Sequence, residues 1–187
     1  MDVFYNGKGC ANLMSGAVLN YKKEWDSIFD KLNHINQYDR DGFIKDLSYQ
    51  VGQIEFFHNN VTRNQTGNPS TSFYKPKKAP EQHQIAYFNL TNGFPKELRG
   101  GHWCYIVKRS KSKYLVIPCT SVKDGKVADP DFQVDIEIDG FENDRTTRLQ
   151  ISDMRTVDAQ RLYINRGFYD TVTERNRIMN KVYEYMS

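Results

Sequence analysis

With 187 residues, 39% hydrophobic and 13% aromatic, the chain has the composition of a soluble globular protein with one core and an appendage. Its formal net charge of +3 excludes a protein that binds polyanions with its whole surface, although basic residues concentrate between Lys96 and Lys113. The longest apolar runs are far shorter than the roughly 20 residues that span a bilayer, so we expect no membrane span.

The N-terminus and the cysteines indicate the compartment. Residues Met1 to Tyr5 lack the cationic start and long apolar stretch of a secretory signal, so we expect a cytoplasmic protein. The three cysteines, Cys10, Cys104 and Cys119, are odd in number and form no C-x-x-C pair. This pattern argues against a disulfide framework and a zinc site, and we expect neither a metal nor another cofactor.

The first third of the chain is predicted to be helical. Apolar residues recur every three or four positions from Val18 to Ile35 and again from Phe43 to Phe57, on either side of a short polar break. Residues 1–60 are therefore predicted to form an α-helical hairpin. Its aromatic stripe, which includes Trp25 and Phe29, is expected to pack rather than to bind a ligand.

A linker and then a β-rich domain follow. Residues 61–83 lose all periodicity and are rich in Asn, Thr, Ser and Pro, which is typical of a linker. Residues 84–187 alternate apolar and polar positions and predict short antiparallel strands in a small barrel or sandwich-like sheet, which makes the chain α+β. The predicted strands are Ile85–Leu90, His102–Arg109, Tyr114–Thr120, Phe132–Asp139 and Thr146–Ser152.

The chain is predicted to end in a helix. Thr171 and Glu174 fit a capping box, and Ile178 and Val182 belong to the apolar side of the helix that follows.

A turn at Ser110–Lys113 would join the second and third strands. An unbroken ladder back from this turn places His102 opposite Ser121. Pro118 cannot donate to a ladder, so it is expected to end regular pairing just before Thr120 and to expose the hydroxyls.

Four side chains near that end of the hairpin suit phosphodiester chemistry. RNA cleavage without a metal needs a proton acceptor, a proton donor and groups that stabilise the charged phosphorane. His102 can exchange protons near neutral pH, and Arg99 can hold phosphate oxygens. Thr120 and Ser121 can donate hydrogen bonds to the same oxygens. A histidine in a strand is also often structural, so both readings of His102 stay open.

A second set of residues is placed to bind RNA. The glycine pair permits close approach of a ligand, an aromatic ring in a loop can stack on a base, and the basic residues attract phosphate. Two alternatives stay open: Trp103 could be buried in the core, and the basic residues from Lys108 onward could form a solvated hairpin tip. The candidates are Phe94, Lys96, Gly100, Gly101, Trp103, Lys108 and Arg109.

Several stretches carry a resemblance to a known family. They are Ile85–Leu90, Leu98–Val107, Val116–Ser121 and Arg148–Leu162, the last ending in Asp-x-Gln-Arg-Leu. In this order they resemble the MazF/PemK toxins of type II toxin-antitoxin systems. The resemblance covers residues 84–187 and implies an SH3-like antiparallel β-barrel, also seen in the gyrase poison CcdB.

The resemblance implies a homodimeric, metal-independent endoribonuclease that cuts single-stranded RNA, such as mRNA, to a 2′,3′-cyclic phosphate and a 5′-hydroxyl. It also implies a cognate antitoxin as partner. The family's catalytic arginine usually lies in an Arg-Pro pair after the loop glycines, where this chain has His102-Trp103. Arg99 and His102 are therefore competing candidates for its role, and Thr120 matches the family's threonine.

Two other functional classes remain open. A binding protein on the same fold could inhibit a host enzyme or sequester RNA without cleaving it, which the missing Arg-Pro pair favours. A nucleotide or DNA hydrolase normally needs a metal cluster or a Walker-type glycine loop, and the sequence shows neither motif. The helical extension could cover the β-rich domain, bind the antitoxin or regulate access to RNA.

Overall fold

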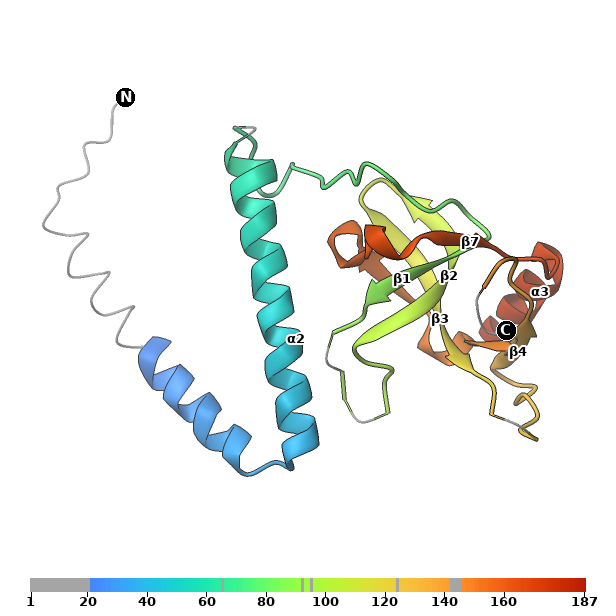
Figure 1. Cartoon of the computed structure of the whole chain (residues 1–187), viewed down its shortest axis with the longest axis horizontal. Helices are drawn as coiled ribbons and strands as arrows, with labels where there is room; N and C mark the ends of the chain where they lie inside the picture. Colours follow the sequence, from blue (N-terminus) through green and yellow to red (C-terminus); the bar gives the residue numbers. More distant parts are fainter. Residues whose placement is uncertain (1–20, 65, 92, 95, 124, 142–145) are drawn as a thin grey trace, which may run out of the picture. The chain divides into compact units, whose positions relative to one another are not determined.

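A computed structural model of the chain describes residues 21–64, 66–91, 93–94, 96–123, 125–141 and 146–187. The chain divides into two compact units, one ending at Lys45 and the other beginning at Asp46. The described part is α+β, with helices before and after a seven-stranded antiparallel sheet (Figure 1). Within this part, no helix is long and apolar enough to cross a membrane.

The two N-terminal helices are confirmed, and in the second unit Tyr49 of α2 stacks on Tyr163. Residues 21–33 are helical, α2 spans Gln37–Phe56, and a π-helical stretch continues over Phe57–Arg63. The start of the first predicted helix, Val18 to Asn20, lies outside the described residues. Trp25 and Phe29 are 46% and 57% exposed, and no residue of α2 is buried. The apolar periodicity predicts which face of a helix is apolar, but it does not predict which other surface of the protein covers that face.

The sheet contains the five predicted strands and two more. Its order is β4-β5-β3-β2-β1-β7, and β6 pairs with β3. Of the two additional strands, β6 has Val157 as its one apolar residue and β7 is three residues long, so neither shows a recognisable alternation. The strands are β1 Gln84–Asn89, β2 Gly101–Ser110, β3 Lys113–Ser121, β4 Gln133–Ile136, β5 Thr147–Gln150, β6 Arg155–Asp158 and β7 Phe168–Asp170.

The strand ladders do not close into the expected barrel. The sheet runs from β4 at one edge to β7 at the other. Just beyond those edges, Asp139 N donates to Asp170 O at 2.9 Å and Val172 N donates to Glu137 O at 2.9 Å. An isolated bridge joins Ile138 to Thr171 between these bonds. The two edges therefore meet in a short contact rather than in a full ladder.

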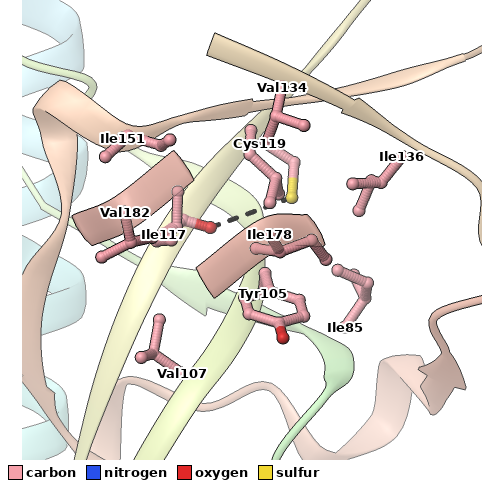
Figure 2. Packing of buried hydrophobic residues seen from close by; sticks show 11 residues of the cluster. Ile85, Tyr105, Val107, Ile117, Cys119, Val134, Ile136, Ile151, Ile178 and Val182 are labelled. Carbon is pink, nitrogen blue, oxygen red and sulfur yellow. Dashed lines mark hydrogen bonds between the residues drawn. The ribbon is translucent and has the colours of Figure 1, made fainter. Parts of the chain in front are cut away.

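The central strands are buried on both faces, because each face carries its own core. One core lies between the sheet and the C-terminal helix α3, Arg175–Met186. Figure 2 shows Ile178 and Val182 of α3 beside Tyr105 and Ile117 of the central strands. The second core gathers Ala86, Phe88, Leu90, Cys104, Ile106, Tyr114, Val116, Val157, Ala159 and Leu162.

The predicted register of the β2–β3 hairpin is wrong beyond its first residues. Arg109 faces Tyr114 and Lys108 faces Leu115, as an unbroken ladder requires. A β-bulge between Ile106 and Lys108 then inserts one residue into β2. Cys104 consequently faces Pro118 instead of Cys119, and every residue nearer the loop moves by one position.

Pro118 ends the β2–β3 ladder, as predicted, but Thr120 and Ser121 go on pairing with β5, and the predicted exposure of the hydroxyls is wrong for half-buried Thr120. The β2–β3 ladder stops at Cys104–Pro118. On its other side, β3 pairs with β6 up to Val116 and with β5 from Cys119 onward, and the short 3-10 helix Ile151–Asp153 lies between these partners. Proline has no N–H to donate to a ladder, and accordingly neither β6 nor β5 pairs with Pro118.

The C-terminal helix is confirmed, but the capping box is wrong. Glu174 is the N-cap of α3 and makes no capping side-chain bond. Thr171 lies three residues before this N-cap, and its buried hydroxyl has no hydrogen-bond partner among the described residues. The hydroxyl of Thr173 accepts from Glu137 N at 2.8 Å. The helix therefore begins too late in the chain for Thr171 to cap it.

His83, just before β1, predicts a pH dependence of stability. Its Nδ1 lies 3.0 Å from the Tyr105 hydroxyl, and burial, with help from Arg175, lowers its pKa from the ordinary value of 6.5. Between that lowered value and about 6.5 the unfolded chain binds more protons than the folded chain. The free energy of unfolding contributed by His83 therefore falls as the pH falls through this range.

His83→Asn tests this dependence, because asparagine tolerates the positive φ of 72° at this position and does not titrate. Urea unfolding of both proteins from about pH 7.5 to pH 5 should show a smaller loss of stability on acidification in the variant. Parallel curves for the two proteins would contradict the assignment.

Candidate functional site

The candidate site lies where β2 and β3 separate, which we call the fork. Beyond the Cys104–Pro118 pair, Gly101 and His102 pair only with β1, while Cys119–Ser121 pair only with β5. With the bulge counted, His102 comes level with Thr120 rather than Ser121. Alternation along each strand places these two residues on the same face of the sheet.

The His102 ring spans the fork through two backbone carbonyls. Nε2 lies 3.0 Å from Arg99 O, and Nδ1 lies 3.4 Å from Cys119 O. A carbonyl oxygen only accepts, so the shorter contact assigns an N–H to Nε2. The imidazole thus joins the backbone of Arg99, in the loop before β2, to the backbone of Cys119, the residue before Thr120.

Two further contacts anchor the loop that carries Arg99. Leu98 N donates to Asp153 Oδ1 at 3.1 Å, and the same oxygen accepts from the Arg155 guanidinium at 3.1 Å. At the other end of the loop, Arg161 Nη1 donates to Thr91 Oγ1 at 3.0 Å. Residues Asp153 and Arg161, late in the chain, therefore hold the two sides of this loop.

Thr120 receives a hydrogen bond from a chain of amides. Gln150 Nε2 donates to Thr120 Oγ1 at 2.8 Å, and Gln133 Nε2 donates to Gln150 Oε1 at 2.9 Å. The backbone N–H of Asp129 donates to Gln133 Oε1 at 2.8 Å. All three side chains of this relay, Thr120, Gln150 and Gln133, are half-buried.

A buried ion pair lies beside the relay on the same face. Arg148, opposite Thr120 in the ladder, donates to both carboxylate oxygens of Asp135 at 2.6 and 2.9 Å. Its guanidinium also donates to the carbonyls of Lys126 and Val127. The hydrogen bonds to Asp135 raise the pKa of Arg148, against the opposing effect of burial. The pair ties the loop after β3 to the sheet.

Ser121 and the glycine pair do not lie beside Thr120 on its face of the sheet. Ser121 is exposed and lies on the opposite face of β3 from Thr120. Gly100 has a φ of 75°, which suits glycine, at the turn into β2. A Cβ at Gly101 would collide with the ring and hydroxyl of Tyr87. The space beside Gly101 is therefore filled by Tyr87.

The predicted RNA-binding residues do not form one surface. Phe94 is 81% exposed in the loop, where Lys96 is also exposed. Trp103 packs edge-on against Tyr87, Phe141 and Tyr169 on the face opposite His102. Lys108 and Arg109 lie at the far end of β2, about 20 Å of strand from His102.

The sequence reasoning missed Gln133, Gln150, Asp135 and Arg148. Asp135, Arg148 and Gln150 each lie between buried residues, and Gln133 begins β4 just before buried Val134. This alternation could have placed the four on one outward face, but their mutual contacts depend on the register of three strands.

The two cysteines of the described residues are buried thiols. Cys104 and Cys119 are free and buried, and burial raises the pKa of both thiols, that of Cys119 to about 12. Cys10 lies outside the described residues. Within the described ranges, no group of three or more His, Cys, Asp or Glu side chains is arranged to hold a metal ion.

No protein-family model and no curated protein matches the sequence.

Proposed function

We propose that the chain is a metal-independent endoribonuclease of the MazF/PemK type, the toxin of a type II toxin-antitoxin system. The observation that carries the proposal is the fork, where the His102 ring joins the Arg99 loop to the strand end that bears Thr120. The edge contact at Ile138–Thr171 supports an SH3-like barrel reading of the sheet. A cytoplasmic homodimer with a cognate antitoxin is part of the same proposal.

The fork offers groups for each part of RNA cleavage. The ribose 2′-oxygen attacks phosphorus and loses its proton, and the departing 5′-oxygen gains one. Arg99 supplies a guanidinium for the phosphate oxygens, and Thr120 supplies a hydroxyl. When Nε2 donates to Arg99 O, the lone pair of neutral His102 lies on Nδ1, which would take up the 2′-proton and return a proton to the 5′-oxygen. The Arg99 guanidinium stays protonated and would hold the phosphorane, and the two residues remain competing candidates for the role of the family's arginine.

Cleavage of a mixed-sequence RNA in EDTA, with mapping of the product ends, tests the proposal. We expect 2′,3′-cyclic phosphate and 5′-hydroxyl ends, and a loss of about hundredfold or more in Arg99→Ala and Thr120→Val, the cost of one lost transition-state donor. Thr156→Val is the matched control, because Thr156 is exposed on β6.

The other outcomes are equally informative. Activity in His102→Gln combined with its loss in Arg99→Ala assigns the chemistry to Arg99, and the reverse assigns it to His102. Cleavage only with magnesium contradicts the mechanism. RNA that is bound but stays intact favours the non-catalytic binding protein, which would inhibit a host enzyme or sequester RNA.

A further inference from the structure

We infer that Gln150, held by Gln133, is a positioning residue that directs the proton of the Thr120 hydroxyl toward a phosphate oxygen of the substrate. The substrate part of this inference rests on the proposed ribonuclease function. The orientation of the hydroxyl rests on the relay of hydrogen bonds alone.

A backbone amide fixes the direction of the relay. The N–H of Asp129 can only donate, so Gln133 must turn its carbonyl oxygen toward it. The amide group of Gln133 then faces Gln150, which must present its own oxygen to accept. The NH₂ of Gln150 is thereby directed at Thr120, and neither glutamine can flip without losing a bond.

This direction makes Thr120 a hydrogen-bond donor. One lone pair of Oγ1 is taken by Gln150, so the hydroxyl proton points away from the relay. Among the residues that the structure describes, this hydroxyl donates no hydrogen bond. Successive bonds from half-buried amides also polarise the hydroxyl and strengthen it as a donor.

The surroundings favour an anionic oxygen as the acceptor. The hydroxyl lies level with His102 on the same face of the sheet, next to the loop that carries Arg99. A donor in this position suits the phosphorane oxygen that gains charge during cleavage. The second lone pair of Oγ1 stays open, but a neutral hydroxyl is a weak base, so the arrangement suits donation better than removal of a proton.

Gln150→Glu tests the relay by reversing its last bond. Near pH 7 a carboxylate can only accept, so Thr120 would donate to it instead of to the substrate. We expect cleavage to fall about tenfold at pH 7 and the ratio to the unmodified protein to recover to within about threefold near pH 4.5, where protonation restores a donor. Gln150→Met should lose activity to a similar extent at both pH values.

Gln37→Glu, at an exposed position at the start of α2, controls for the added charge and should match the unmodified protein. If Gln150→Glu unfolds more readily in urea, Gln133→Glu repeats the test one step away. Equal activity of Gln150→Glu and the unmodified protein at both pH values, or a loss that does not recover on acidification, overturns the relay.

An NMR measurement separates the relay from the proposed function. The side-chain amide resonances of Gln150 should shift in Thr120→Val and stay nearly unchanged in Thr120→Ser. Absence of the shift overturns the relay even if RNA is cleaved. A shift in a protein that leaves RNA intact overturns the proposed function, and with it the substrate role of Thr120, while the hydroxyl orientation stands.

Discussion

Ile178→Ala is expected to cost about 3 kcal/mol of folding free energy, in the middle of the range for removing a buried isoleucine side chain beyond Cβ. Ile178 is completely buried and lies in the core between α3 and the sheet, beside Tyr105 (Figure 2). The cavity left behind would be lined by strands that cannot collapse onto it, because their ladders hold them apart. Urea unfolding with linear extrapolation measures the loss.

Ile164→Ala is the matched control, because it removes the same atoms at a site that is 38% exposed. We expect it to cost about 1 kcal/mol or less. Equal losses in the two variants would mean that α3 does not pack on the sheet as described.

Asp135→Ala is expected to cost about 3 kcal/mol, the lower end of the range for breaking a buried ion pair, because the Asp135 side chain is 32% exposed. The substitution leaves the Arg148 guanidinium, with 8% of its side chain exposed, without a counter-charge. Adding Arg148→Met should recover part of the loss, since the double variant has no uncompensated charge.

Glu81→Ala provides the comparison for this pair, because the Arg109–Glu81 pair is longer, at 3.7 Å, and largely exposed. Its loss should stay within about 0.5 kcal/mol. If the double variant lost as much as the sum of its parts, Asp135 and Arg148 would contribute independently, and the described pairing would be wrong.

The fork shows which aspects of a site local sequence patterns can predict. Thr120 and His102 were identified from their residue types, the glycine pair and Pro118. Their placement on one face at the same level was not predicted, because it depends on a single extra residue in β2 between Ile106 and Lys108. The apolar residues on both sides of that bulge fit either register, since the central strands are buried on both faces.

The relay was beyond sequence reasoning for a related reason. Gln133 and Gln150 come from two four-residue strands, and Thr120 comes from a third. An isolated glutamine in a short strand is an ordinary surface residue. Only the pairing of Gln133 with Gln150, and of β5 with β3, brings the three side chains within hydrogen-bonding distance.

The sequence by itself determined the α+β class, both N-terminal helices, five of the seven strands, the C-terminal helix and the end of the β2–β3 ladder at Pro118, because periodicity and proline geometry act over a few residues. The tertiary structure decided the register of the hairpin, the exposure of the helical stripe, the meeting of the sheet edges and the contacts around Thr120. These features depend on pairing between segments far apart in the chain, which no local pattern specifies.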